Sequence, residues 1–316
     1  MATAPAPVRR AAPLPVVLSV LGSAAYLAFV YLVNAAYPTT VAPVWQAELW
    51  NYGTAALAMV LIHVCTRGVQ RPRPALPAGT PSLGWLLTIL GVGLVLVALF
   101  WMATTSAPIR WLIATIYRLG AQFGLPHGVL SVLVNVLAGG LWITAVLTGL
   151  SVWRVRQGGG AIGFRFGRID WLLGLALILF AIAAAYVEDH LYFGGTQPAG
   201  RYLPQTLWAI PSFLLMTLVN GLQEETLFRG YVLPQLLAFL RRPWLAMLLM
   251  ITIFDLFHLP SDVIGHQIAW GPATLTLLFP LQPTGLLFGY TYWRSRSLVP
   301  GILLHTYTTL WAFFFL

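Results

Sequence analysis

The sequence predicts an all-α, polytopic membrane protein. Hydrophobic residues make up 59% of the chain and charged residues only 8%, and the mean hydropathy is +0.82. This composition is typical of proteins that cross a bilayer several times rather than of soluble domains. Apolar runs of membrane-spanning length recur along the chain, and tryptophans lie near their ends, as an interfacial aromatic belt requires.

About nine apolar runs are long enough to cross a membrane as helices. In chain order they cover residues 14–36, 48–65, 83–103, 128–152, 170–190, 211–240, 243–259, 268–293 and 298–316. The first run follows Arg9 and Arg10 and is too long for a cleaved signal peptide, so we interpret it as a retained first span. We find no soluble domain and no internal repeat. The chain therefore divides into a region of about five spans, residues 1–204, and a C-terminal region, residues 205–316.

The basic residues are all arginines, and their distribution predicts the orientation of the chain. They lie between apolar runs rather than in one stripe, which favours topology determinants over a nucleic-acid-binding patch. When the spans alternate in direction, most arginines fall on the side of the N-terminus, and Arg110, Arg118 and Arg201 fall on the other. This asymmetry predicts a cytoplasmic N-terminus. The absence of lysine is typical of GC-rich genomes, so we expect a prokaryotic cell membrane.

An acidic pair lies inside the sixth apolar run. Residues 224 to 229 read Glu-Glu-Thr-Leu-Phe-Arg, with apolar sequence on both sides. A carboxylate at the centre of a membrane helix costs roughly 2.5–3.5 kcal/mol, so two of them require partners, a water-filled cavity or a chemical role. Glu225 and Arg229 are four residues apart and share a helix face, which predicts an ion pair. Glu224 then faces a cavity.

A helical hairpin is predicted to bring a histidine to the depth of these acids. If Arg241 and Arg242 form the turn, Glu225 lies about 17 residues before it and His258 about 16 after it, at nearly the same level. A carboxylate and an imidazole at one level can polarise a shared water as a general base. Phe254 lies one turn before His258 on the same face. Asp255 is placed to hold one ring nitrogen of His258 and to fix its tautomer.

The last apolar run contributes His305 and, four residues later on the same face, Thr309. Hydrogen-bond donors at this position would form an oxyanion hole for an acyl-transfer intermediate. His305 lies only about nine residues after Arg296, so it reaches the depth of the other groups only if the helix is tilted or the turn is recessed.

The three motifs together resemble the CAAX prenyl protease and bacteriocin-processing (CPBP) family of intramembrane glutamic endopeptidases, also called Abi proteins. The motifs are Glu224-Glu225-xxx-Arg229, Phe254-xxx-His258, and His305 followed by a short polar residue four positions later. Gly230 after the arginine and the segment Gly285-Leu-Leu-Phe-Gly-Tyr before the final histidine also fit. The resemblance covers roughly residues 205 to 316.

The resemblance implies roles for these residues. Glu224 and His258 would activate the attacking water, Glu225 and Arg229 would support the site, and His305 with residue 309 would stabilise the oxyanion. The family usually has Asn where this chain has Thr309. In eukaryotic relatives the resemblance implies prenylated CAAX peptides as substrates, although nothing in this sequence encodes a prenyl pocket.

We expect a metal-free site. The chain lacks an H-E-x-x-H motif, and its single cysteine, Cys65, excludes an intramolecular disulfide and a cysteine-based metal cluster. A glutamate and two histidines are nevertheless a set that can bind zinc.

The leading hypothesis is an intramembrane endopeptidase that hydrolyses a peptide or lipidated peptide in the bilayer by direct attack of an activated water. We expect no covalent acyl-enzyme, because neither a serine nor the cysteine accompanies the motifs. The alternatives are a non-catalytic immunity or scaffold protein of the same fold, and a proton-coupled transporter in which the Glu, Arg and His residues form a relay.

Overall fold

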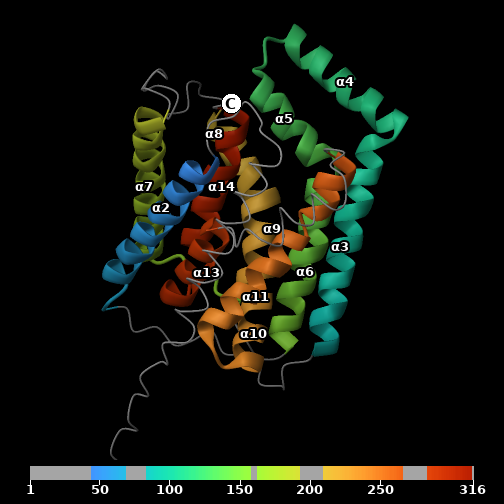
Figure 1. The fold of residues 1–316 in the computed structure, drawn as a ribbon. Coiled ribbons are helices and arrows are strands. Elements are labelled where there is room, and N and C mark those ends of the chain that lie inside the picture. Colours follow the sequence, from blue (N-terminus) through green and yellow to red (C-terminus); the bar gives the residue numbers. More distant parts are fainter. Residues whose placement is uncertain (1–43, 69–82, 158–161, 193–208, 266–282, 315–316) are drawn as a thin grey trace, which may run out of the picture. The chain divides into compact units, whose positions relative to one another are not determined.

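A computed structural model of the chain describes residues 44–68, 83–157, 162–192, 209–265 and 283–314 (Figure 1). Every regular element within these ranges is a helix, which confirms the predicted all-α class. Residues 50–316 form one compact unit, and the description below concerns that unit. The predicted first span, 14–36, and most of the eighth, 268–293, lie outside the described residues.

The helices before residue 200 include long apolar helices and one shorter amphipathic helix, α4 (Ala107–Gln122), that connects two of them. The helices in this part are α2 (Val44–Cys65), α3 (Leu83–Thr105), α4, α5 (His127–Asn135), the π-helical segment η1 (Val136–Gly140), α6 (Leu141–Gln157) and α7 (Arg168–Tyr192). Helix α4 lies between two predicted spans, where the sequence analysis placed no element. It begins with Pro108 in its first turn and packs on α5, where Tyr117 contacts the Ser131 hydroxyl at 2.8 Å.

The C-terminal region carries all the predicted site residues, on its helices or, for His258, in the turn after α11 (Pro243–Leu256). The helices are α8 (Ala209–Met216), η3 (Thr217–Gly221), α9 (Leu222–Glu224), η4 (Glu225–Val232), α10 (Leu233–Leu240), α11, η5 (Ser261–Gly265), α13 (Pro283–Ser295) and α14 (Val299–Phe314). From Ala209 to Leu240 the chain is helical without a break, in agreement with the predicted span 211–240. The wider π-helical turns fall on both sides of Glu224, and such turns are frequent at functional sites.

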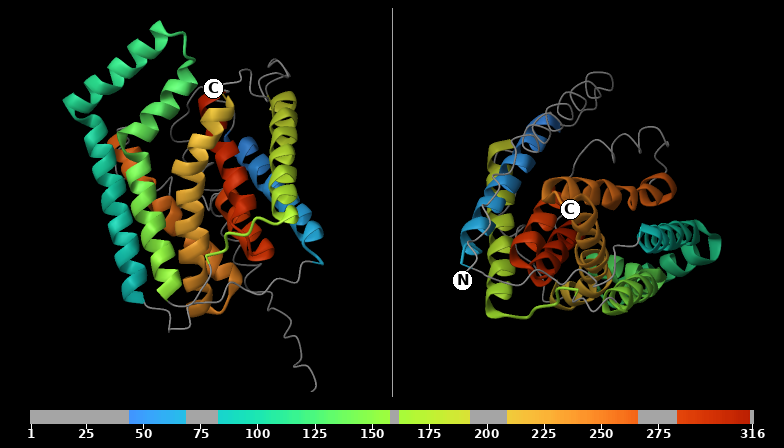
Figure 2. Two further views of the ribbon diagram at one scale, coloured as in Figure 1. Left: turned by 180° about the vertical axis from the view of Figure 1, so that it is seen from behind. Right: turned by 90° about the horizontal axis from the view of Figure 1, so that it is seen from below.

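The predicted turn at the two arginines is confirmed. Helix α10 ends at Leu240, Arg241 adopts a left-handed conformation with φ of 52°, and α11 begins at Pro243. The two helices pack against each other (Figure 2). This hairpin brings the acidic pair and the Phe254–His258 segment into one region of the molecule, as the sequence predicted.

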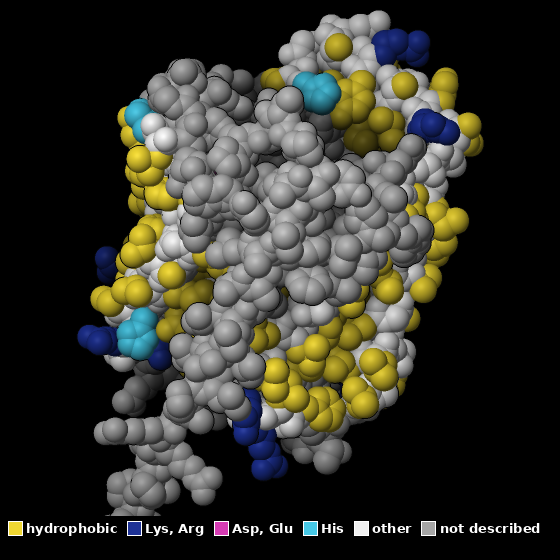
Figure 3. All heavy atoms as spheres, in the orientation of Figure 1, with side chains coloured by type: hydrophobic (Ala, Val, Ile, Leu, Met, Phe, Trp, Pro, Cys, Tyr) yellow, Lys and Arg dark blue, Asp and Glu magenta, His cyan; other side chains and the backbone are white. Residues whose placement is uncertain are grey.

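Two described helices, Leu83–Thr105 and Arg168–Glu188, are long and apolar enough to cross a membrane. Their apolar side chains point outward: Leu87 and Val95 on α3 and Leu172 and Leu179 on α7 are all more than half exposed. Hydrophobic side chains cover much of the described surface visible in Figure 3. Large exposed apolar surfaces of this kind are covered by lipid or by other protein. The count of nine spans stays a prediction, since the other described apolar helices are shorter.

The core lies where η4, α10 and α11 meet α6, α13 and α14. Every side chain of η4 is buried, including its charged ones. Around it pack apolar residues that are fully or almost fully buried, among them Leu227, Leu233, Met247, Met250, Ile251 and Leu298. The charged residues of η4 are therefore enclosed by protein rather than exposed to lipid.

Candidate active site

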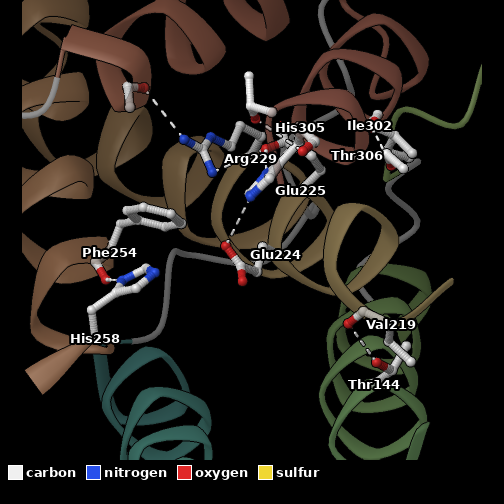
Figure 4. Close-up of polar contacts among 12 residues, drawn as sticks. Thr144, Val219, Glu224, Glu225, Arg229, Phe254, His258, Ile302, His305 and Thr306 are labelled. Atoms are coloured by element: carbon white, nitrogen blue, oxygen red, sulfur yellow. Dashed lines mark hydrogen bonds and ion pairs between the residues drawn. The ribbon is translucent and has the colours of Figure 1, made fainter. Parts of the chain in front are cut away.

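The predicted ion pair between Glu225 and Arg229 is confirmed. The Arg229 Nη1 and Glu225 Oε1 atoms are 3.1 Å apart, and the two side chains are 0% and 1% exposed (Figure 4). Taking a charge out of water costs several kcal/mol unless it is paired, so each residue makes the burial of the other tolerable. The pair forms the charged centre of the site.

Arg229 is held by more than its carboxylate partner. Its guanidinium carbon lies 4.9 Å from the centre of the Phe254 ring and 5.1 Å from the centre of the Phe288 ring. Its Nη2 donates a hydrogen bond of 3.3 Å to the carbonyl of Gly285. These contacts come from α11 and α13, so the arginine joins three segments that are distant in the sequence.

His305 of α14 lies between the two glutamates. Its Nδ1 is 3.0 Å from Glu225 Oε1, and its Nε2 is 3.2 Å from Glu224 Oε2 (Figure 4). The imidazole also stacks on Phe288, with ring centres 4.9 Å apart and an interplanar angle of 8°. His305 therefore reaches the depth of the acids, which the short distance to Arg296 left uncertain, and both of its ring nitrogens contact carboxylates.

Glu224 faces a cavity of about 250 Å³, as the sequence predicted. His258 lines the same cavity, so the two residues expected to activate water share one space. The other described walls come from α3, the end of α5, η1, α6, the helix that carries Glu224, and the segment from Phe257 to Ser261 after α11. They include Phe100, Trp101 and Phe257. Water, a carboxylate and an imidazole can meet there, and this is the minimal equipment for general-base hydrolysis.

The predicted role of Asp255 is wrong. His258 Nδ1 lies 3.1 Å from the carbonyl oxygen of Phe254 and not at the carboxylate of Asp255. Helix α11 ends at Leu256, and the carbonyls of a last turn have no partner from the helix itself, so the ring of His258 folds back onto one of them. Asp255 is 1% exposed, and its Oδ1 makes no hydrogen bond among the described residues.

The structure does not place the predicted oxyanion pair on the cavity. Thr309 is half-buried on α14 and is not among the described residues that line the cavity. His305 does not line it either, and its ring nitrogens contact Glu224 and Glu225. If the site stabilises an oxyanion, the donor would come from another residue, or His305 would have to release a carboxylate.

Three supporting residues were not found from the sequence. Phe288 stacks on His305 and Arg229 at once. Gly301 lies against the acid pair, since a Cβ atom at this position would be 2.6 Å from Glu225 Oε2. Ser261 lines the cavity with His258, although the sequence analysis found no serine at the site. For Gly301 and Ser261 the sequence signal was spacing, because Gly301 precedes His305 by four residues and Ser261 follows His258 by three. Phe288 lies in the segment Gly285-Leu-Leu-Phe-Gly-Tyr that fits the family, but no role was inferred for it.

Among the residues that the structure describes, no three His, Cys, Asp or Glu side chains are arranged to hold a metal ion. Glu224 and His305 are close, but the second carboxylate contacting His305 belongs to Glu225, which is bound to Arg229. This donor set does not fit a zinc site. The expectation of metal-free chemistry stays a prediction.

The C-terminal region matches a known family model. Residues 206–311 match the model described as Rce1-like, type II CAAX prenyl endopeptidase. This segment contains the acidic pair, His258, His305 and Thr309, and it agrees with the stretch of roughly residues 205 to 316 over which the sequence resembles the CPBP family. The division of the chain into two regions at residue 205 stays a prediction. No curated protein and no solved structure matches the chain.

Proposed function

We propose that this chain is an intramembrane peptidase whose general base is Glu224. The proposal starts from the match of residues 206–311 to the Rce1-like family of CAAX prenyl endopeptidases. The observation that carries the proposal is the cavity that Glu224 shares with His258. Membrane embedding is a property of the family and fits the two long, apolar and outward-facing helices α3 and α7.

The reaction would begin with a water molecule between Glu224 and His258. Glu224 takes a proton from the water while the water oxygen attacks the carbonyl carbon of the scissile peptide bond. The carbonyl electron pair moves to its oxygen, and a tetrahedral intermediate forms. When the C–N bond breaks, the proton held by Glu224 passes to the leaving nitrogen, and the products are a carboxylic acid and an amine. The acid then gives up the remaining water proton, which leaves a carboxylate and an ammonium group.

The buried charges position the base rather than react. With both glutamates ionised, His305 satisfies its two contacts only when both ring nitrogens carry a proton, so it is cationic. The cluster then holds two negative charges and two positive ones, from Arg229 and His305. Glu225 and Arg229 fix His305, and His305 fixes one oxygen of Glu224, which directs the other toward the cavity.

The test is cleavage of quenched fluorescent reporter peptides by purified protein in liposomes, with farnesylated and unmodified CAAX termini. Glu224→Gln keeps the size of the side chain but cannot accept the proton, so turnover should fall about 10²–10⁴-fold. Glu188→Gln is the matched control, because Glu188 is a half-buried acid on α7 that lines a different cavity. Near-normal turnover by the Glu224 variant would contradict the mechanism.

Ser261 offers a covalent route that the same assay can exclude. It lines the cavity beside His258, and a serine next to a histidine can act as a nucleophile. For direct attack by water, Ser261→Ala should keep most of the activity, and mass spectrometry of the enzyme during turnover should show no acyl adduct. A trapped acyl-enzyme would replace the water mechanism by a covalent one.

Two other functions remain distinguishable by experiment. A proton-coupled transporter would show proton-dependent flux without peptide cleavage, and a scaffold or immunity protein would bind a partner without turnover. The substrate can be sought by comparing membrane proteomes with and without the protein, because an uncut precursor should accumulate. We further propose a prokaryotic cell membrane with a cytoplasmic N-terminus, supported by the arginine distribution and testable with reporter fusions at loop positions.

A further inference from the structure

Asn220 lies in the wall of the cavity that holds Glu224 and His258. It is four residues before Glu224 on the same continuous helix, in the π-helical segment η3. Its side chain is half-buried, and its amide makes no hydrogen bond to any described residue. A side-chain amide that faces a cavity without a protein partner is available to a ligand.

The backbone around Asn220 is fixed by a neighbouring helix. The hydroxyl of Thr144 on α6 lies 2.8 Å from the carbonyl oxygen of Val219 and 3.0 Å from Oε1 of Gln223 (Figure 4 shows the first contact). These two contacts lie on either side of Asn220 and hold its helix against α6. The backbone of Asn220 therefore has a set position relative to Glu224, and its amide can turn toward a carbonyl oxygen in the cavity, where a donor would stabilise developing negative charge.

The described cavity wall also carries other neutral donors, namely Asn135, Gln223, Trp101 and Ser261. The Oε1 atom of Gln223 lies 3.0 Å from the Thr144 hydroxyl, which ties this side chain to α6, and Trp101 has an interaction of its own. Asn220 differs from them because it lies four residues before Glu224 on the same continuous helix, and residues four apart share a helix face. His305 and Thr309, the pair expected from the sequence, are not among the described residues lining the cavity.

We infer that the Asn220 amide donates a hydrogen bond to the oxygen of the scissile carbonyl and stabilises the negative charge that develops there. This inference rests on the proposed peptidase function. As the water oxygen bonds to the carbonyl carbon, the C=O electron pair moves to the oxygen, and an N–H of Asn220 faces that charge. Glu224 and Asn220 then act on opposite ends of the same addition, and no proton is transferred to or from the asparagine.

The experiment measures kcat and KM separately for Asn220→Ala and Asn220→Asp with the farnesylated reporter. Both changes remove the amide donors, and the aspartate keeps the shape of the side chain. Loss of one oxyanion donor should lower kcat about 10²–10³-fold. KM should change little, because the donor acts on charge that appears only in the transition state. Asn51→Ala, which alters an exposed asparagine of α2, is the matched control and should keep normal kinetics.

A second readout does not depend on turnover. In the Glu224→Gln background, Asn220→Ala should weaken binding of a phosphinate peptide, an anionic tetrahedral analogue, about 10²-fold or more. Binding of the parent peptide should stay unchanged.

The outcomes separate this inference from the proposed function. The oxyanion role is overturned if kcat is normal, if only KM changes, or if both variants fail to fold, because Asn220 would then serve binding or packing. The proposed peptidase function would still stand in these cases, provided that the wild type cleaves the reporter and that cleavage depends on Glu224. If the wild type cleaves no reporter, and no precursor accumulates in membranes that lack the protein, both the proposed function and the role of Asn220 are refuted.

Discussion

Replacing Glu225 by glutamine should destabilise the protein because it removes the carboxylate from a buried arginine. Arg229 is 0% exposed and its Nη1 lies 3.1 Å from Glu225. Breaking a buried ion pair by removing one partner typically costs about 3–5 kcal/mol, since the remaining charge stays buried. The variant also weakens the hydrogen bond of 3.0 Å between His305 and position 225, because an amide oxygen replaces a carboxylate.

Other contacts of Arg229 place the expected cost at the lower end of this range. The Gly285 carbonyl at 3.3 Å and the rings of Phe254 and Phe288 at 4.9 and 5.1 Å persist in the variant. A desolvated cation–π contact is worth about 2 kcal/mol, so the arginine keeps part of its stabilisation. We expect a loss of about 3 kcal/mol, which lowers the melting temperature on the order of 5–10 °C.

The assay is thermal and denaturant unfolding in detergent for Glu225→Gln, Arg229→Met and the double variant. The double variant should lose clearly less than the sum of the two single ones, with a coupling of at least about 1 kcal/mol, the size found for residues in one ionic network. Glu188→Gln, outside the network, should be near neutral. Additivity within about 0.5 kcal/mol would refute the reasoning, because it would show that Arg229 does not depend on Glu225.

Three further outcomes follow from the geometry of the site. Gly301→Ala should lower both stability and turnover, because the new Cβ would lie 2.6 Å from Glu225 Oε2. Gly149→Ala is the control: no atom lies within 4 Å of a Cβ added there, so the change should be neutral or stabilise α6 by up to about 1 kcal/mol. Equal behaviour of the two variants in thermal scans and turnover assays would contradict this packing. Thr309→Val should leave kcat within a few-fold of the wild type in the reporter assay, because Thr309 is absent from the described cavity wall, and a loss of about 10²-fold or more would restore its oxyanion role. Dialysis against a chelator should leave turnover unchanged, and activity that disappears and returns only with zinc would overturn the metal-free prediction.

Much of the site could be predicted because it depends on helix periodicity. The spacing of four between Glu225 and Arg229 fixes a shared face, and the arginine turn at 241 and 242 fixes the depth of His258. Both inferences use only the rise and pitch of a helix, which the sequence carries locally. The all-helical class follows from composition in the same way.

The side-chain partners could not be predicted by the same means. Asp255 is three residues before His258, yet the helix ends between them and a free carbonyl competes for the imidazole. His305 was expected to face an oxyanion, but its contacts depend on how α14 packs against the helix of the acidic pair, and that packing has no local signal. The π-helical segments around Glu224 also shift which residues face the cavity, and they follow no simple repeat.

The described cavity wall extends beyond the segment that matches the family model. Every charged residue of the site lies within 206–311, the segment that matches the family. The opposite wall, however, comes from Val97, Phe100 and Trp101 of α3 and from Asn135 and Ile143 around η1, all outside that segment. Under the proposed function, a peptide that approaches Glu224 would contact this wall. The C-terminal helices would then supply the chemistry, and the N-terminal helices would help to set the shape of the substrate site. This division would explain why the motifs point to a type of chemistry but not to a particular peptide.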